Sequence, residues 1–279
     1  MKEWFLNKHS DEITTQEIDA KLLETMRARK WSETTSNEYG VCLVHTYKLA
    51  MDRGELTTNP AQKAQRYKLH NERKRELSAG EETRLRVAIR ENYPGKEVEL
   101  DLALHCGCRR SNLYGIHTKG RKPMAPLDWK DVDLNFKVIR FPRAKGGDGY
   151  TVPLNSVALA ALKKLLTRAP DETGPVIRKP SGLELHSCRK WFETCLEKAK
   201  IENFRFHDLR HTFGTRLRRN GVPLEDIALL LDHDVPELRM TLRYAHADMD
   251  RLFKAVATLE TSTKTDTPAI LEFPTAVAV

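Results

Sequence analysis

Apolar residues recur every three to four positions over 18–26 and again over 41–51, which is typical of helices that bury one face. The first of these helices is predicted to start at Thr14 and the second at Ser32, because hydroxyl side chains favour helix N-termini. Pro60 follows and interrupts the helical pattern, since proline disfavours the helical region for the residue before it. Residues 11–58 are therefore predicted to be helical.

The pattern changes in the middle of the chain. Residues 135–141 and 150–153 have the composition of strands, and the glycine-rich stretch 146–149 between them is typical of a hairpin turn. Ser78, with Glu81 three residues later, predicts another helix start. Further helices are expected at about 100–105, 156–168, 185–200, 208–220, 224–231 and 236–259. The fold class predicted is mainly α with a small antiparallel β segment.

A strongly basic stretch, residues 63–77, separates the two helical regions. Its bases are Lys63, Arg66, Lys68, Arg73, Lys74 and Arg75. Such a run is typical of a solvated connector, and equally of a strap that lies along a nucleic-acid backbone; the run alone does not separate these. The predicted organisation is a helical domain over 1–66, a basic linker over 67–77, a larger domain over 78–260 and a tail over 261–279.

Composition narrows the class of protein. The 47 Lys and Arg residues exceed the 39 Asp and Glu residues by 8, which favours a polyanionic partner. With 40% hydrophobic residues, a disordered chain is excluded. No apolar run approaches the roughly 18–20 residues of a membrane span, and no signal peptide is recognised, so no membrane partner is expected. Five cysteines without paired spacing favour a reducing compartment, and a cytoplasmic location is predicted.

Candidate catalytic side chains lie in five short segments: residues 106–113, Lys145, and residues 207–213, 231–233 and 243–246. Between them they supply two arginines, two histidines, a lysine and a tyrosine. Guanidinium groups hold phosphate oxygens well, and the other groups can act as nucleophile, base and acid in cleaving a phosphodiester. No acidic cluster resembles a two-metal site, so neither a metal nor a cofactor is expected.

Each segment is a weak signal by itself, since a helical histidine or a lone tyrosine is more often structural than catalytic. Cys106 and Cys108 are interpreted as core residues, because no second ligand pair stands at zinc spacing. The order of all five segments, however, resembles that of the tyrosine recombinase, or phage integrase, family. The resemblance covers residues 100–250, and residues 11–60 resemble the family's core-binding domain.

The resemblance implies a role for each residue. Tyr244 would attack the scissile phosphate and form a 3′-phosphotyrosyl link, while Arg109 and Arg210 would clamp the phosphate oxygens. The remaining catalytic roles would fall to three further residues. His207 would accept the tyrosine proton, His233 would donate to a phosphate oxygen, and Lys145 would protonate the leaving 5′ oxygen.

Three positions depart from the family pattern. Asn112 stands where the family often has an acid, and Asp232 replaces the usual glycine before His233, where it is expected to alter the backbone. The interval from His233 to Tyr244 is longer than usual and contains Pro236.

The resemblance implies double-stranded DNA as the partner and site-specific recombination of a mobile element as the function. A homo-tetramer on two DNA sites would be the active assembly, with a monomer allowed for the free protein. An accessory excision or DNA-bending factor is left open. The alternatives are a type IB topoisomerase-like enzyme that relaxes DNA, a non-catalytic DNA-binding relative, and a basic helical protein with chance motifs.

Overall fold

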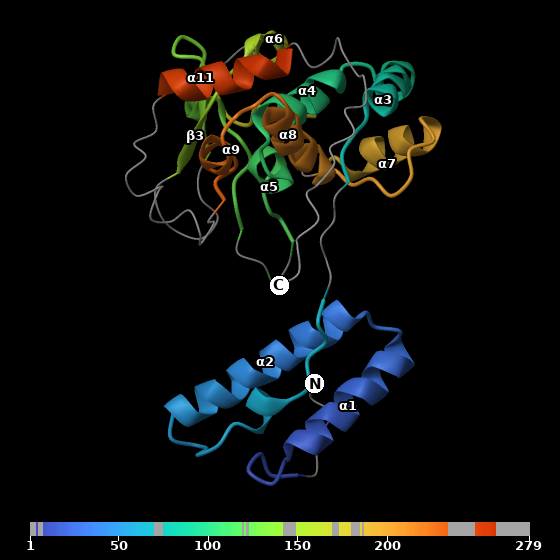
Figure 1. Cartoon of the computed structure of the whole chain (residues 1–279), viewed down its shortest axis with the longest axis vertical. Coiled ribbons are helices and arrows are strands. Elements are labelled where there is room, and N and C mark those ends of the chain that lie inside the picture. Colours follow the sequence, from blue (N-terminus) through green and yellow to red (C-terminus); the bar gives the residue numbers. More distant parts are fainter. Residues whose placement is uncertain are drawn as a thin grey trace, which may run out of the picture. The chain divides into compact units, whose positions relative to one another are not determined.

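The chain folds into two compact units, Met1–Arg73 and Lys74–Val279, and the boundary between them lies in the basic stretch (Figure 1). The computed structural model describes Trp4 and residues 8–69, 75–118, 120, 123–141, 149–168, 173–179, 185, 187–233 and 249–260. None of the helices in these ranges is long and apolar enough to cross a membrane.

The first unit is built on two helices, α1 (Thr15–Arg29) and α2 (Glu33–Asp52). Thr14 caps α1 through a reciprocal arrangement in which its side chain accepts from the Glu17 amide and Glu17 accepts from the Thr14 amide. Ser32 caps α2 by accepting from the Thr35 amide. Both predicted helix starts are therefore confirmed.

A short 3-10 helix, η1 (Pro60–Lys63), and the chain after it return along these helices. Ala61 and Ala64 are buried in the core of the unit. The Asn37 side chain donates to the Tyr67 carbonyl at 2.8 Å and accepts from the Tyr67 amide at 3.0 Å. The first residues of the basic stretch are thus held in the first unit.

The second unit is centred on α4 (Glu97–Cys106), whose residues are almost all buried. It packs against α6 (Ser156–Leu166) and α8 (Asp208–Arg219). A three-stranded antiparallel sheet has the order β1 (Val132–Asp133), β2 (Val138–Phe141) and β3 (Tyr150–Pro153). The predicted fold class, mainly α with a small antiparallel sheet, is confirmed.

Two predicted elements start later than expected. Residues 135–137 form a turn instead of a strand, because the Asp133 carboxylate accepts from the amides of Asn135 at 3.0 Å and Phe136 at 2.9 Å. The helix predicted from residue 185 is α7 (Arg189–Lys198).

Other elements complete the second unit. The prediction from residue 224 is confirmed as α9 (Leu224–Leu231), while the short α5 (Arg110–Tyr114) was not predicted. Of the helix predicted over 236–259, the part described is α11 (Met249–Ala257), followed by the 3-10 helix η4 (Thr258–Glu260).

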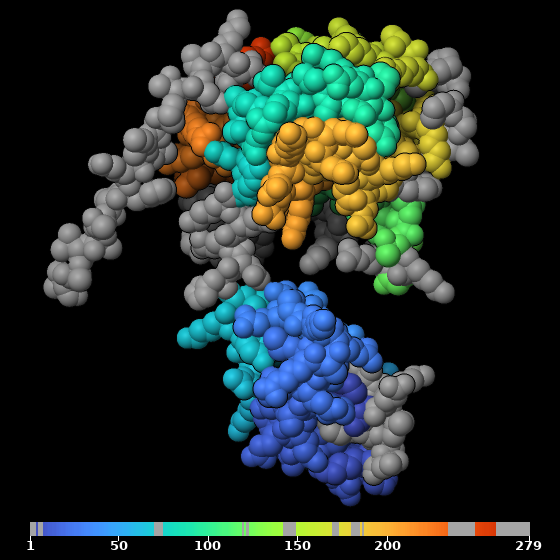
Figure 2. Space-filling model, turned by 90° about the vertical axis from the view of Figure 1, so that its right-hand side faces the viewer, coloured from blue at the N-terminus to red at the C-terminus, as the bar shows by residue number. Residues whose placement is uncertain are grey.

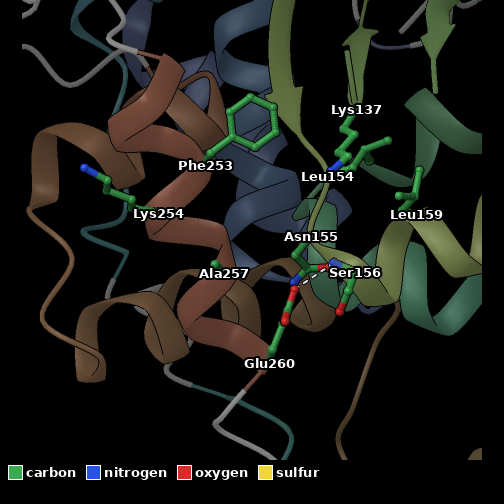
Figure 3. Close-up of a pocket in the computed structure, with 9 residues that line it drawn as sticks. All are labelled: Lys137, Leu154, Asn155, Ser156, Leu159, Phe253, Lys254, Ala257 and Glu260. Atoms are coloured by element: carbon green, nitrogen blue, oxygen red, sulfur yellow. Dashed lines mark hydrogen bonds between the residues drawn. The ribbon is translucent and has the colours of Figure 1, made fainter. Parts of the chain in front are cut away.

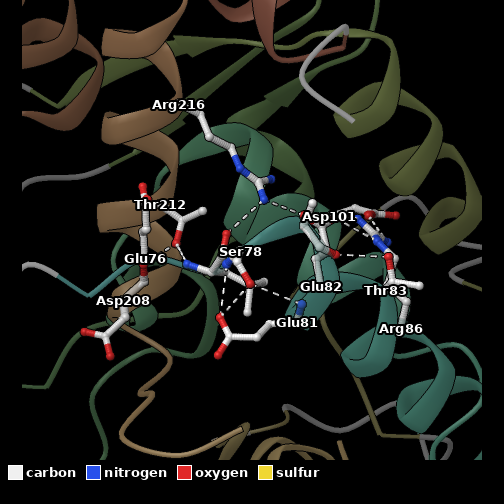
Figure 4. A network of polar contacts seen from close by, with 12 residues as sticks. Glu76, Ser78, Glu81, Glu82, Thr83, Arg86, Asp101, Asp208, Thr212 and Arg216 are labelled. Atoms are coloured by element: carbon white, nitrogen blue, oxygen red, sulfur yellow. Dashed lines mark hydrogen bonds and ion pairs between the residues drawn. The ribbon is translucent and has the colours of Figure 1, made fainter. Parts of the chain in front are cut away.

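Helix α3 (Ala79–Asn92) joins α4 and α8 through buried charges (Figure 4). Glu82 lies between Arg86 at 2.7 Å and Arg216 of α8 at 2.6 Å, and Arg86 also pairs with Asp101 of α4 at 2.7 Å. Ser78 caps α3 together with Glu81, as predicted. On its other side α3 packs against α7 (Figure 2).

Helix α11 is fixed to the centre of the unit through Asn155, which caps α6. The Asn155 amide donates to the Val256 carbonyl of α11 at 3.0 Å and lies 2.9 Å from a ring nitrogen of His105 in α4. In η4, which follows α11 directly, Glu260 accepts from the Ser156 amide at 2.7 Å (Figure 3). The helix that follows the predicted nucleophile in sequence is thereby anchored on α4 and α6.

Candidate active site

Gly107 sets the geometry at the end of α4. Its φ of +58° lies in the left-handed region, and a Cβ at this position would stand 2.4 Å from the ring of Phe213. Glycine is therefore required for both its backbone conformation and its lack of a side chain. The turn places Arg109 at the start of α5, and the Gly107 carbonyl faces Arg210 of α8.

Arg210 is buried, with 3% of its surface exposed. Its guanidinium donates to the Gly107 carbonyl at 2.8 Å and to the Leu231 carbonyl at the end of α9. Burial lowers the pKa of Arg210, and the neighbouring charge of Arg109 acts in the same direction. An arginine side chain remains charged under such conditions, so the site holds a fixed positive charge.

Helix α9 ends in a Schellman motif, which leaves its last carbonyls free to face the arginines. The Asp232 amide donates to the Leu229 carbonyl at 3.1 Å, and the His233 amide donates to the Ala228 carbonyl at 3.0 Å. Asp232 has φ +48° and ψ +47°, the left-handed conformation that glycine usually takes here. Asp232 therefore keeps the conformation of the glycine that it replaces, because aspartate tolerates the left-handed region.

Arg109 lies against the same helix end. Its two terminal nitrogens donate to Asp232, one to the carboxylate at 3.2 Å and the other to the backbone carbonyl at 3.1 Å. The carbonyls of Leu231 and Asp232 thus hold Arg210 and Arg109 side by side. The C-terminal end of a helix carries partial negative charge, which favours two cations at this place.

Two histidines belong to the same cluster. Burial, followed by the charges of Arg210 and Arg109, lowers the pKa of His233 from 6.5 to about 4. Partial burial, His211 and Arg210 lower the pKa of His207, whose ring lies 5.1 Å from that of His211. Both site histidines are therefore neutral at pH 7, so either can accept a proton.

Asn112 and Tyr150 support this cluster from two sides. The Asn112 side chain is buried and accepts from the Arg109 amide at 3.1 Å, so the amide fixes the backbone on which Arg109 stands. Tyr150 was not predicted as part of the site. Burial raises the pKa of its hydroxyl, while the charges of Arg210 and Arg109 act to lower it. The sequence shows Tyr150 only as a residue of a predicted strand, and nothing in it indicates that Tyr150 lies near Arg109 and Arg210.

Four of the six predicted catalytic residues come together: Arg109, His207, Arg210 and His233. Lys145 and Tyr244 lie outside the described residues, as do Arg73 and Lys74 of the predicted DNA-binding set.

The other members of that set are divided between the two units. Lys63, Arg66 and Lys68 are exposed on the first unit. Arg75 belongs to the second unit, where it pairs with Glu81 and lies 5.1 Å from the ring centre of Phe204.

The described residues have no candidate metal site, and the hollow found on their surface lies away from these arginines and histidines. Within the described ranges, no group of three His, Cys, Asp or Glu side chains could hold a metal ion. Cys106 and Cys108 are buried free thiols, which confirms their interpretation as core residues. A surface hollow between α6 and α11 is lined by Leu159, Phe253 and other residues, none of them a predicted site residue (Figure 3).

The sequence and the fold were compared with those of known proteins. The sequence model of the phage integrase family matches residues 75–251. The chain belongs to the phage integrase family.

One relative is the integrase of Salmonella phage P22, 30% identical over 214 residues, an alignment that covers 71% of this chain and 50% of that protein. The chain thus spans about half the length of this curated relative.

Solved structures of integrases share the fold. The Tn1549 transposon integrase in complex with circular intermediate DNA has a TM-score of 0.63 at 22% identity, over 86% of this chain and 84% of that one. Lambda integrase, solved as a tetramer bound to a Holliday junction, has a TM-score of 0.61 at 20% identity, over 80% and 62% of the two chains. The likeness establishes the fold of a phage integrase.

Proposed function

We propose that the protein is a site-specific DNA recombinase, an integrase that cleaves and rejoins DNA through a 3′-phosphotyrosyl intermediate on Tyr244. The observation that carries this proposal is the pair of guanidiniums held together at the end of α9, with His207 and His233 in the same electrostatic cluster. Such a cluster suits a phosphate with two exposed oxygens, because guanidinium donors bind them with charge-assisted hydrogen bonds. Membership of the phage integrase family supports the same assignment.

The proposed reaction is balanced without an added reactant. The Tyr244 oxygen forms a bond to phosphorus as the bond to the 5′ oxygen breaks, and Arg109 and Arg210 hold the charge on the remaining oxygens. His207 accepts the tyrosine proton, a role that its lowered pKa suits because the ring is neutral at pH 7.

Two further groups complete the reaction. Lys145 gives a proton to the 5′ oxygen, and His233 donates to a phosphate oxygen. Reversal of these steps rejoins the strand, since the phosphotyrosyl link retains the bond energy.

The partner proposed is double-stranded DNA, and the active assembly is a homo-tetramer on two sites. The net charge of +8 supports a DNA partner, and the exposure of Lys63, Arg66 and Lys68 supports contacts between these bases and phosphates. Lambda integrase, whose fold is similar, is a tetramer on a Holliday junction, which supports the tetramer.

A two-site plasmid tests the function. A site is first selected from a fragment pool by binding, and two copies are placed on one supercoiled plasmid. The proposal predicts deletion or inversion between the copies, and none with the Tyr244→Phe variant. Relaxation of a plasmid that lacks the site would favour a topoisomerase-like enzyme. Binding without any strand exchange or relaxation would favour a non-catalytic relative.

A further inference from the structure

Asp232 makes two different contacts with Arg109. One comes from its backbone carbonyl, at 3.1 Å, which any residue at this position would offer. The other comes from its carboxylate, at 3.2 Å, which only an acidic side chain supplies. Among the described residues, Asp232 is the carboxylate that forms an ion pair with Arg109.

The carboxylate is held in place by the fold. The Asp232 side chain is 12% exposed, whereas the Arg109 side chain is 38% exposed. The left-handed φ of +48° fixes the direction of the Asp232 side chain at the end of α9. Both terminal nitrogens of the guanidinium thus rest on Asp232, whose carboxylate is nearly buried, while part of the Arg109 side chain stays exposed.

The ion pair between Asp232 and Arg109 also offsets the repulsion between the two arginines. Arg109 and Arg210 carry like charges that act on each other, and both lie at one helix end. Helix carbonyls supply only partial negative charge, so a full counter-charge stabilises the pair before any phosphate arrives. Asn112 is neutral and contacts the backbone of Arg109, so it does not supply that charge.

We propose that Asp232 is a positioning residue for catalysis: its carboxylate holds the guanidinium of Arg109 in the orientation in which it meets the scissile phosphate. The proposal rests on the recombinase function proposed above. Asp232 touches Arg109 and acts through it, without contact to the DNA.

Two substitutions isolate the carboxylate. Asp232→Asn keeps the shape of the side chain, Asp232→Gly removes it, and both residues tolerate the left-handed conformation and retain the backbone carbonyl. We expect each to lower the single-turnover rate of covalent adduct formation on a nicked suicide substrate about tenfold, because small misplacements of catalytic groups cost rate. The melting temperature of each variant is measured as well, so that a loss of rate is separated from a loss of folded protein.

Lys200→Gly is the matched control. Lys200 follows α7 with φ +54°, so its replacement by glycine relieves the same kind of backbone strain elsewhere in the unit. Its cleavage rate should equal that of the wild type. A double-mutant cycle with Arg109→Lys completes the design. In that background Asp232→Asn should change the rate less than twofold, because the group through which it acts is already altered.

The outcomes are distinguishable. If the wild type forms the adduct and both Asp232 variants form it at the wild-type rate, the positioning role is overturned and the proposed function stays intact. A faster rate for Asp232→Asn would show that the carboxylate competes with phosphate, which also overturns it. The same loss in the Arg109→Lys background would show that Asp232 acts by another route. Absence of an adduct from the wild type would remove the proposed function and this inference together.

Discussion

At the scale of single residues, one backbone conformation at Gly107 controls both site arginines. Its carbonyl accepts from Arg210, and its turn leads directly into Arg109. We predict that Gly107→Ala lowers the free energy of unfolding by about 3 kcal/mol, since it adds left-handed strain to a clash with Phe213. Gly221→Ala is the control: φ is +80° but nothing lies within 4 Å, so about 1 kcal/mol is expected. Urea denaturation of both variants checks this, and equal losses would contradict the clash.

The site histidines predict a pH dependence of DNA binding. The pKa of His233 is lowered to about 4 in the free protein, by burial and by Arg210 and Arg109. A bound phosphate raises that pKa, so the complex takes up protons and affinity rises as the pH falls from 7 toward 5. Titration of DNA binding over this range measures the slope, which His233→Gln should flatten. A wild-type affinity that does not change with pH, or an unchanged slope in the variant, would contradict the assignment.

The sequence was sufficient to select Arg109, His207, Arg210 and His233 as one cluster, because their order along the chain follows the family pattern. It could not predict the ion pair between Arg109 and Asp232, since 123 positions separate them and only the fold brings them together. Asp232 was expected to disturb the backbone, yet aspartate adopts the conformation of the glycine it replaces. Its carboxylate then gains a contact that glycine could not make.

At the scale of elements, the junction of α3, α4 and α8 depends on Glu82. Burial acts to raise the pKa of Glu82, but Arg216 and Arg86 outweigh it and the pKa lies below its usual value. We predict that Glu82→Gln destabilises the protein by about 3 kcal/mol, because the half-buried Arg216 loses the Glu82 carboxylate, while Arg86 keeps its ion pair with Asp101.

An exposed pair provides the control for Glu82. Glu193 pairs with Arg189 along α7, with 61% of its side chain exposed, so Glu193→Gln should cost less than about 0.5 kcal/mol. Thermal unfolding of the two variants measures the difference. Similar small losses would mean that the buried network contributes little to stability.

Local rules predicted the three capped helix starts well, and they predicted the start of α7 and the strand start poorly. Thr14, Ser32 and Ser78 cap their helices as predicted, because capping depends on residues within one turn. The strand predicted from residue 135 begins at Val138. The reason is a turn in which the Asp133 side chain accepts from the amides of Asn135 and Phe136. The helix α5 has five residues, too few to show an apolar period.

At the scale of the whole molecule, the basic stretch is shared between two folded units. Residues up to Tyr67 are bound to α2 in the first unit, whereas Arg75 pairs with Glu81 in the second. Composition could not show whether the basic stretch is a solvated connector or packs on a folded unit. A packed segment with exposed bases can have the same composition as a connector. Contacts to DNA through Lys63, Arg66 and Lys68 remain a prediction.

The central claim, a phosphotyrosyl intermediate on Tyr244, is tested most directly by covalent trapping. Wild type and Tyr244→Phe are incubated in EDTA with nicked suicide substrates drawn from fragments selected by binding. We predict a protein–DNA adduct that resists denaturation, forms with the wild type and is absent with the variant. An adduct that persists in Tyr244→Phe, or tight binding without an adduct from either protein, would contradict it.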